Sequence, residues 1–176
     1  MSKLPDQVSP ASPRPAEPFT DDEFRAALGQ FTTGVTIVTA CDPEGRLIGL
    51  TANSFNSVSL SPPLVLWSLA RQSTSMPGFL AASHYAINVL AADQRLLAER
   101  FARKGIDRFE GTPWHRGLTG APVIDGAVAV FECSHRSQHD EGAHLIFVGR
   151  VEHCSRRVGA TPLVFHGGRF LTDLSI

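Results

Sequence analysis

The stretch over residues 49–69, GLTANSFNSVSLSPPLVLWSL, combines small polar side chains with a strongly apolar run. Thr51, Ala52, Asn53 and Ser54 carry little bulk and several hydroxyl or amide groups. A backbone flanked by such residues can lie close to a flat polar ligand and donate hydrogen bonds to it. The same composition is typical of an ordinary polar strand and turn, so these residues alone leave both interpretations open.

Cationic residues in polar loops indicate a place for an anionic group. Arg71, Arg103 and Lys104 follow expected strands or helices, and Ser73 and Ser75 stand close to Arg71 in sequence. Guanidinium, ammonium and hydroxyl groups together form charge-assisted hydrogen bonds to phosphate. Each of these residues alone is also typical of a charged surface.

Histidines could serve as ligands in two different ways. His144 enters a β-branched strand after an acidic loop and could meet an anionic or amide-bearing ligand, although hairpin-end histidines are commonly only solvated. His135 and His139 are four residues apart, with Cys133 and Cys154 nearby in sequence. An expected strand at His135 prevents the two histidines from sharing a helical face, and the cysteines lack CxxC spacing. We therefore predict no metal site.

Several other kinds of active site lack their sequence signatures. No GxSxG elbow is present, which argues against a Ser-His-Asp hydrolase. The three cysteines all fall on expected strands, so we predict that they are buried rather than nucleophilic. Neither GxGxxG nor GxxxxGK[ST] occurs, so a nucleotide would be bound without these glycine-rich loops.

The composition is that of a globular protein of 176 residues with 43% hydrophobic residues. Lys and Arg number 16 and Asp and Glu 17, so no basic excess favours binding to nucleic acid. No apolar run approaches the roughly 20 residues that span a membrane. Few, unpaired cysteines are typical of a reducing compartment, and we expect a soluble cytoplasmic protein.

The N-terminal residues 1–20 contain five of the twelve prolines and few bulky side chains, which predicts a disordered arm. Thr20 and Glu23 fit a capping box, and apolar residues at helical spacing then predict a short helix that ends within residues 29–34. Residues 21–176 are expected to form one domain.

The remaining pattern is mainly that of strands. Short helices are predicted from Ser75 to residue 82 and over 93–102, and a long functional loop over 103–126 with Trp114 as its anchor. No strand–helix–strand periodicity appears, which favours a mainly antiparallel sheet closed into a barrel with helices at its ends. Extended segments are predicted over 35–40, 46–52, 56–60, 64–69, 84–90, 127–134, 145–154 and 161–171.

Taken as an ordered set, these segments resemble the flavin reductase-like family. More narrowly, the chain resembles the small reductase component of two-component flavin-dependent monooxygenases. The resemblance covers roughly residues 24–171. The matching motifs are FTTGVTIVTA (31–40), GLTANSFNSVSLSPPLVLWSL (49–69), YAINVL (85–90), LAERFA (97–102), HLIFVGRV (144–151) and PLVFHGGRF (162–170).

The resemblance implies a six-stranded antiparallel split barrel of Greek-key type with short flanking helices. It also implies a homodimer with FMN or FAD bound near the subunit interface. By motif position, the nicotinamide of NADH or NADPH would meet His144, Arg169 and Phe170, while Ala143 stands where the family often has Asp. The implied flavin-binding residues are Thr51, Ala52, Asn53, Ser54 and Ser59, then Ser68, Arg71, Ser73 and Ser75 at the ribityl-phosphate end, with Phe101 and Lys104 nearby.

The implied activity is reduction of FMN or FAD by hydride transfer from NAD(P)H, with the reduced flavin supplied to a partner monooxygenase. Since orientation drives hydride transfer, no catalytic acid or base is predicted. Two alternatives stay open: a flavoprotein with tightly bound flavin that acts on its own substrate, and a non-catalytic barrel that only binds flavin. The residues do not decide between FMN and FAD, and the absence of a clear 2′-phosphate clamp favours NADH only mildly.

Overall fold

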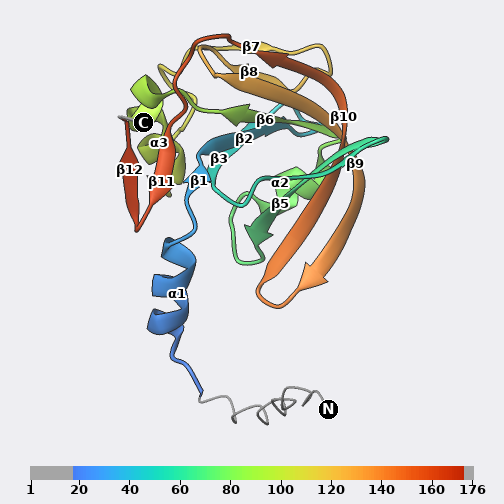
Figure 1. Ribbon diagram of the computed structural model, residues 1–176. Helices are drawn as coiled ribbons and strands as arrows, with labels where there is room; N and C mark the ends of the chain where they lie inside the picture. The colour runs from blue at the N-terminus through green and yellow to red at the C-terminus, as the bar shows by residue number, and fades with distance from the viewer. Residues whose placement is uncertain (1–17, 173–176) are drawn as a thin grey trace, which may run out of the picture.

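The computed structural model describes residues 18–172, and β-strands make up far more of this length than helices do (Figure 1). The predicted class, mainly β with short helices, is confirmed, while residues 1–17 of the predicted arm lie outside the described part. The helices are α1 (Asp21–Gly29), α2 (Met76–Ala81), the 3-10 helix η1 (Ala92–Gln94) and α3 (Arg95–Ala102). The strands are β1 (Thr33–Gly34), β2 (Thr36–Cys41), β3 (Leu47–Ala52), β4 (Asn56–Leu60), β5 (Pro63–Ala70), β6 (His84–Val89), β7 (Trp114–Arg116), β8 (Pro122–Ile124), β9 (Ala129–Glu141), β10 (His144–Arg156), β11 (Val164–His166) and β12 (Arg169–Leu171).

The main sheet has seven strands in the order β3-β2-β6-β9-β10-β5-β4, and each neighbouring pair is antiparallel. The predicted number of six strands is therefore wrong. One edge strand is β4, which pairs with β5. Asn56 lies opposite Leu66 at one end of this ladder, and Leu60 lies opposite Pro63 at the other. The sequence of β4 predicts only an extended continuation of the preceding segment, because its mostly exposed residues give no clear apolar alternation. Within residues 18–172, no ladder joins the two edge strands β3 and β4.

Two small sheets complete the fold. Strands β1, β11 and β12 form one, and β7 pairs with β8 in the other. The prediction of a loop over 103–126 is therefore wrong in its second half, which contains β7 and β8. Strands of three residues are too short to show the alternation of apolar and polar residues by which a strand is predicted. Trp114 does anchor this region, since its ring meets that of Phe109 edge to face at a centroid distance of 5.9 Å.

The longest feature is the hairpin of β9 and β10, each of 13 residues (Figure 1). The predicted end of the first strand at residue 134 is too early, because the strand continues through the exposed polar run 136–141. β10 also pairs with β5 on its other side, with His144 opposite Ala70. The hairpin turn at residues 142–143 therefore lies next to the end of β5.

An aromatic core lies inside the main sheet. The Trp67 and Phe147 rings stack at 4.7 Å between centroids and 11° between planes, and both are fully buried. Tyr85 and Phe79 meet Trp67 edge to face. Such pairs stabilise a core beyond the area that they bury. A second cluster joins Phe101 of α3 to β2 and to the loop before β7.

Helix α1 begins with the predicted capping box. Thr20 Oγ1 accepts a hydrogen bond from the N–H of Glu23 at 3.2 Å, and Glu23 Oε2 accepts one from the N–H of Thr20 at 2.7 Å. The helix buries none of its residues, and Phe24 and Leu28 are exposed. Figure 1 shows α1 extending away from the body of the fold. In the part of the chain that the structure describes, no helix is long and apolar enough to cross a membrane.

Candidate functional site

The predicted flavin-binding segment begins at the end of β3, where neighbouring elements hold the strand firmly. Thr51 Oγ1 donates a hydrogen bond to the carbonyl of Ala98 in α3 at 2.6 Å. Thr36 Oγ1 in β2 donates one to the carbonyl of Ala52 at 2.7 Å. The next residue, Asn53, is exposed. The segment is therefore a fixed strand end followed by an open turn.

Ser54 and Ser68 were both predicted to line the ligand, and the structure brings them together. Ser54 Oγ accepts a hydrogen bond from the N–H of Ser68 at 2.9 Å and donates one to its carbonyl at 3.1 Å. Ser59 lies apart from this pair, because its Oγ accepts a hydrogen bond from the N–H of Ser61 in the β4–β5 turn. Ser59 is therefore close to Ser54 in sequence without sharing its hydrogen bonds.

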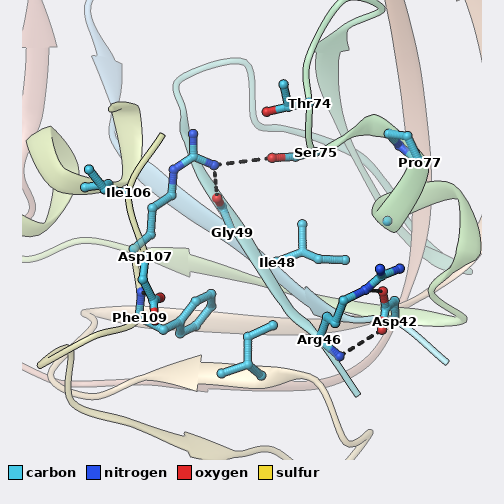
Figure 2. A pocket seen from close by; sticks show the side chains of 13 residues that line it. Asp42, Arg46, Ile48, Gly49, Thr74, Ser75, Pro77, Ile106, Asp107 and Phe109 are labelled. Carbon is cyan, nitrogen blue, oxygen red and sulfur yellow. Dashed lines mark hydrogen bonds and ion pairs between the residues drawn. The ribbon is translucent and has the colours of Figure 1, made fainter. Parts of the chain in front are cut away.

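A pocket of about 460 Å³ opens between β3, the loop before α2 and the loop that follows α3 (Figure 2). Among the predicted flavin residues, Ser75 lines it. Thr74 lies beside Ser75 on the same rim. The floor is formed partly by Ile48 and Gly49, and Phe109 contributes an aromatic edge. The pocket thus combines hydroxyl groups with an apolar surface, as sites for small organic ligands commonly do.

Arg108 crosses this pocket and was missed by the sequence reasoning. Its Nη1 donates hydrogen bonds to the carbonyl of Gly49 at 2.6 Å and to Ser75 Oγ at 3.3 Å, drawn as dashed lines in Figure 2. Its Nε and Nη2 both donate to the carbonyl of Arg103. Burial lowers the pKa of the guanidinium. The only sequence signal was a cation within the long glycine-rich loop.

Gly49 allows a close approach between β3 and the aromatic rings behind it. A Cβ at this position would lie 2.6 Å from Phe101 Cε1 and 3.3 Å from Phe109 Cε2. Phe101, predicted near the flavin, is fully buried and supports β3 through this contact. Lys104, predicted beside it, is exposed. The glycine is therefore required by packing, because its backbone φ is not in the left-handed region.

A second arginine stands on the opposite rim of the pocket (Figure 2). Asp42 accepts hydrogen bonds from the N–H of Arg46 at 2.8 Å and from its Nε at 2.6 Å. Burial raises the pKa of the Asp42 carboxyl, but the hydrogen bonds and charge of Arg46 outweigh it, and the net pKa is lowered. The pocket is thus lined by two arginines and two carboxylates, Asp42 and Asp107, and one of the arginines is paired with Asp42.

The remaining predicted cation, Arg71, faces a different element. Its Nη2 forms an ion pair with Asp140, and its Nε donates to the carbonyl of Gly142 at 3.4 Å. Ser73 Oγ accepts a hydrogen bond from the N–H of Ser75 at 3.3 Å, which places the two serines together. Within the described residues, Arg71 therefore contacts the β9–β10 hairpin and lies outside the lining of the larger pocket.

The three residues predicted for the nicotinamide nucleotide lie on two separate elements. His144 is exposed at the start of β10. Arg169 and Phe170 lie on β12, where the Phe170 ring meets Phe165 at a centroid distance of 5.4 Å. Figure 1 shows β12 at the left edge of the fold and the β9–β10 turn at the lower end of the long hairpin. One subunit therefore does not bring these residues together.

The cysteines differ from one another in exposure. Cys133 is fully buried, and burial together with Glu152 and Glu132 raises the pKa of its thiol to about 12. Cys41 is only half-buried and Cys154 is exposed, so the prediction that all three are buried is wrong for these two. Among residues 18–172, no group of three or more His, Cys, Asp or Glu side chains is placed to hold a metal ion.

Comparison with known protein families gives one match over most of the chain. A family model described as "Flavin reductase like domain" matches residues 28–172. The FMN reductase (NADH) SmoA of Agrobacterium fabrum is 54% identical over 147 residues, which are 84% of this chain and 83% of that protein.

Two further relatives differ in how much of their length is matched. The reductase component of a flavin-dependent trigonelline monooxygenase from Acinetobacter baylyi is 43% identical over 85% of this chain. The match covers 48% of that protein, so the chain spans about half of its length. Among solved structures, the NADH:FAD oxidoreductase SgcE6 of Streptomyces globisporus, in complex with NAD and FAD fragments, superposes with a TM-score of 0.84. It is 38% identical and covers 91% of this chain and 98% of its own.

Proposed function

The chain belongs to the flavin reductase like domain family, and from this premise we propose that it serves as the reductase of a two-component oxygenase system. It is an NAD(P)H-dependent flavin reductase that uses FMN or FAD. The observation that carries this conclusion is the family match over residues 28–172, within which every predicted site residue falls. Relatives named as monooxygenase reductase components support an oxygenase as the consumer of reduced flavin.

The flavin site extends from the end of β3 to the pocket beside Ser75. Residues 53–55 lie between β3 and β4 and outside both strand ladders, so the ladders leave their N–H groups for a ligand. The pocket adds hydroxyl groups and Arg108, a donor set that suits the phosphate end of a flavin nucleotide. The residues assigned to the flavin are Thr51, Ala52, Asn53, Ser54, Ser59, Ser68, Ser73, Ser75, Phe101 and Lys104. Arg71, which the resemblance assigns to the ribityl-phosphate end, is left out of this set because its guanidinium group is bound to Asp140 and Gly142.

The residues of this chain contribute orientation and electrostatics. When bound, a flavin supplies a ring that accepts a hydride from a reduced nicotinamide. The hydrogen bonds of Thr51 and Ser54 fix the strand end and the turn, so these residues would hold a bound flavin in one orientation. The main-chain N–H groups of Asn53 and Ser54 would donate hydrogen bonds to a flavin and favour its negatively charged form, and no side chain is assigned as an acid or base.

The nicotinamide nucleotide is assigned to His144, Arg169 and Phe170. Their placement on distant elements of one subunit supports a homodimer in which each subunit completes the other's site. We also assign the curled main sheet to a split barrel. The protein is expected to act in the cytoplasm, where reduced nicotinamide nucleotides are available.

The test is anaerobic oxidation of NADH or NADPH by the purified chain, with FMN, FAD or riboflavin supplied in turn. We expect nucleotide oxidation only when flavin is present, with accumulation of free reduced flavin. Admission of air to a dialysis chamber that holds a reduced-flavin-dependent oxygenase and its substrate should then support the oxygenase reaction. Flavin that stays bound and reduced, with no turnover of added flavin, would contradict the proposal.

A further inference from the structure

Arg71 forms three contacts with the turn of the β9–β10 hairpin. Its main-chain N–H donates a hydrogen bond to the carbonyl of Ala143 at 2.9 Å. Its Nε donates to the carbonyl of Gly142 at 3.4 Å, and its Nη2 forms an ion pair with Asp140. One residue directly after β5 therefore binds the β9 limb and both residues of the turn.

These contacts act directly on the position of His144. Ala70, which precedes Arg71, lies opposite His144 in the ladder between β5 and β10, and Glu141 lies opposite it in the hairpin itself. Gly142 has a φ of 56°, so the turn uses a left-handed backbone conformation that glycine adopts without steric cost. Because residues 136–144 are exposed, packing does little to hold this end of the hairpin.

We propose that Arg71 is a positioning residue for nicotinamide binding: it fixes the turn that presents His144. The inference rests on the proposed assignment of His144 to the nicotinamide nucleotide. The side chain of Arg71 acts at the hydride-donor side of the site, although its loop also carries Ser73 and Ser75 of the proposed flavin side. The five-residue loop 71–75 therefore borders both the proposed nicotinamide site and the proposed flavin site.

The test uses Arg71→Met, Asp140→Asn and the double variant. An exposed ion pair shifts an equilibrium by up to about fivefold. We expect each single variant to raise the KM for NADH about two- to fivefold, with kcat and the flavin Kd changed by less than about twofold. Because both substitutions remove the same ion pair, the double variant should resemble Arg71→Met, which also loses the bond to the Gly142 carbonyl. Arg71→Lys keeps the charge and should recover part of the loss.

The matched control is Asp22→Asn, which breaks the exposed ion pair with Arg25 on α1 and should leave KM unchanged. If Arg71→Met fails to fold, Asp140→Asn at an exposed position carries the test alone. Loss of flavin affinity with an unchanged KM for NADH would overturn the proposal, as would additive effects in the double variant. If His144→Ala also leaves that KM unchanged, the assignment of the nicotinamide site fails instead.

Discussion

The hydroxyl group of Ser54 forms two hydrogen bonds with the main chain of Ser68. Ser54 Oγ accepts from the N–H of Ser68 and donates to its carbonyl, so it replaces a main-chain partner at that point of β5. The two residues are 14 apart in sequence. This link fixes the turn after β3 to the strand that also borders the aromatic core at Trp67. The position of the turn after β3, which we assign to the flavin site, therefore depends on the side chain of Ser54.

The first prediction concerns that hydroxyl. Ser54→Ala leaves two partly buried main-chain groups without their partner, which costs about 1–3 kcal/mol of the free energy of unfolding. The same change frees the turn, so we expect the flavin Kd to rise. Urea unfolding and flavin titration measure the two effects. Ser57→Ala, an exposed serine in the same region, is the control. Equal effects of both substitutions would mean that the link has no special role.

The second prediction concerns the contact between Gly49 and Phe101. Gly49→Ala places a methyl group against a fully buried ring, and overpacking of this kind costs about 1–3 kcal/mol. We expect a lower unfolding free energy and weaker flavin binding, because β3 must move away from α3. Gly34→Ala is the matched control, since a Cβ there meets nothing within 4 Å. A Gly49→Ala protein as stable as the control would show that the ring can move aside.

The sequence predicted best those features that depend on neighbouring residues. Thr20 and Glu23 form the expected capping box, because both partners lie within one helical turn. The predicted extended segment over 46–52 corresponds to β3 (Leu47–Ala52), because its pattern depends only on residues next to one another in sequence. Because the interacting residues of such local patterns lie close together in sequence, the sequence alone can predict them.

The features that the sequence did not predict depend on contacts between distant residues. Arg108 reaches Gly49 across 59 positions, and Arg71 reaches Asp140 across 69. The neighbours of Arg108 in sequence do not distinguish it from a surface cation, and those of Arg71 indicate a phosphate instead of Asp140, because the partners are defined only by the folded sheet. For β4, the exposed residues hide the pairing that makes it an edge strand. Tertiary context therefore decided the composition of the pocket and the extent of the sheet.

The third prediction concerns Arg108. Arg108→Met removes the guanidinium that joins β3 to the 103–109 loop, and hydrogen bonds to a charged group contribute about 1.5–3 kcal/mol each. We expect lower stability and a flavin Kd raised about tenfold or more for FMN and FAD. Riboflavin, which lacks the phosphate, should be affected less. Fluorescence titration with the three flavins makes the comparison.

Its control is Arg116→Met, because Arg116 is exposed and bonds only the nearby carbonyl of Gly120 among the described residues. That substitution should alter neither stability nor flavin affinity. If Arg108→Met weakens riboflavin and FMN by the same factor, the arginine supports the loop and does not contact phosphate.

The fourth prediction concerns pH. His135 packs against the rings of Tyr85 and Phe147, and its Nε2 is buried without a hydrogen-bond partner among residues 18–172. Burial, with a smaller contribution from His84, lowers the pKa of His135. The unfolded chain therefore binds the proton more readily, so stability is full above the ordinary pKa of about 6.5 and decreases as the pH falls below it.

We expect His135→Phe, which removes the titrating group and keeps a ring in the core, to flatten this decrease between about pH 7.5 and 5.5. Urea unfolding at several pH values measures it. The exposed His139 supplies the control variant His139→Gln, which should retain the wild-type slope. An unchanged slope in His135→Phe would assign the pH dependence to another group.

The last prediction separates the two substrate sites. His144 stands on an exposed turn away from the small-residue wall, so its ring can contact the nicotinamide nucleotide without contributing to the flavin pocket. His144→Ala should therefore raise the KM for NADH by about tenfold, the effect of losing roughly 1.4 kcal/mol of binding, and change the flavin Kd by less than about twofold. Steady-state kinetics and flavin titration on the same preparation give both numbers. Equal losses in the two would place His144 in a shared structural role, because a contact made only to the hydride donor cannot weaken the binding of the acceptor.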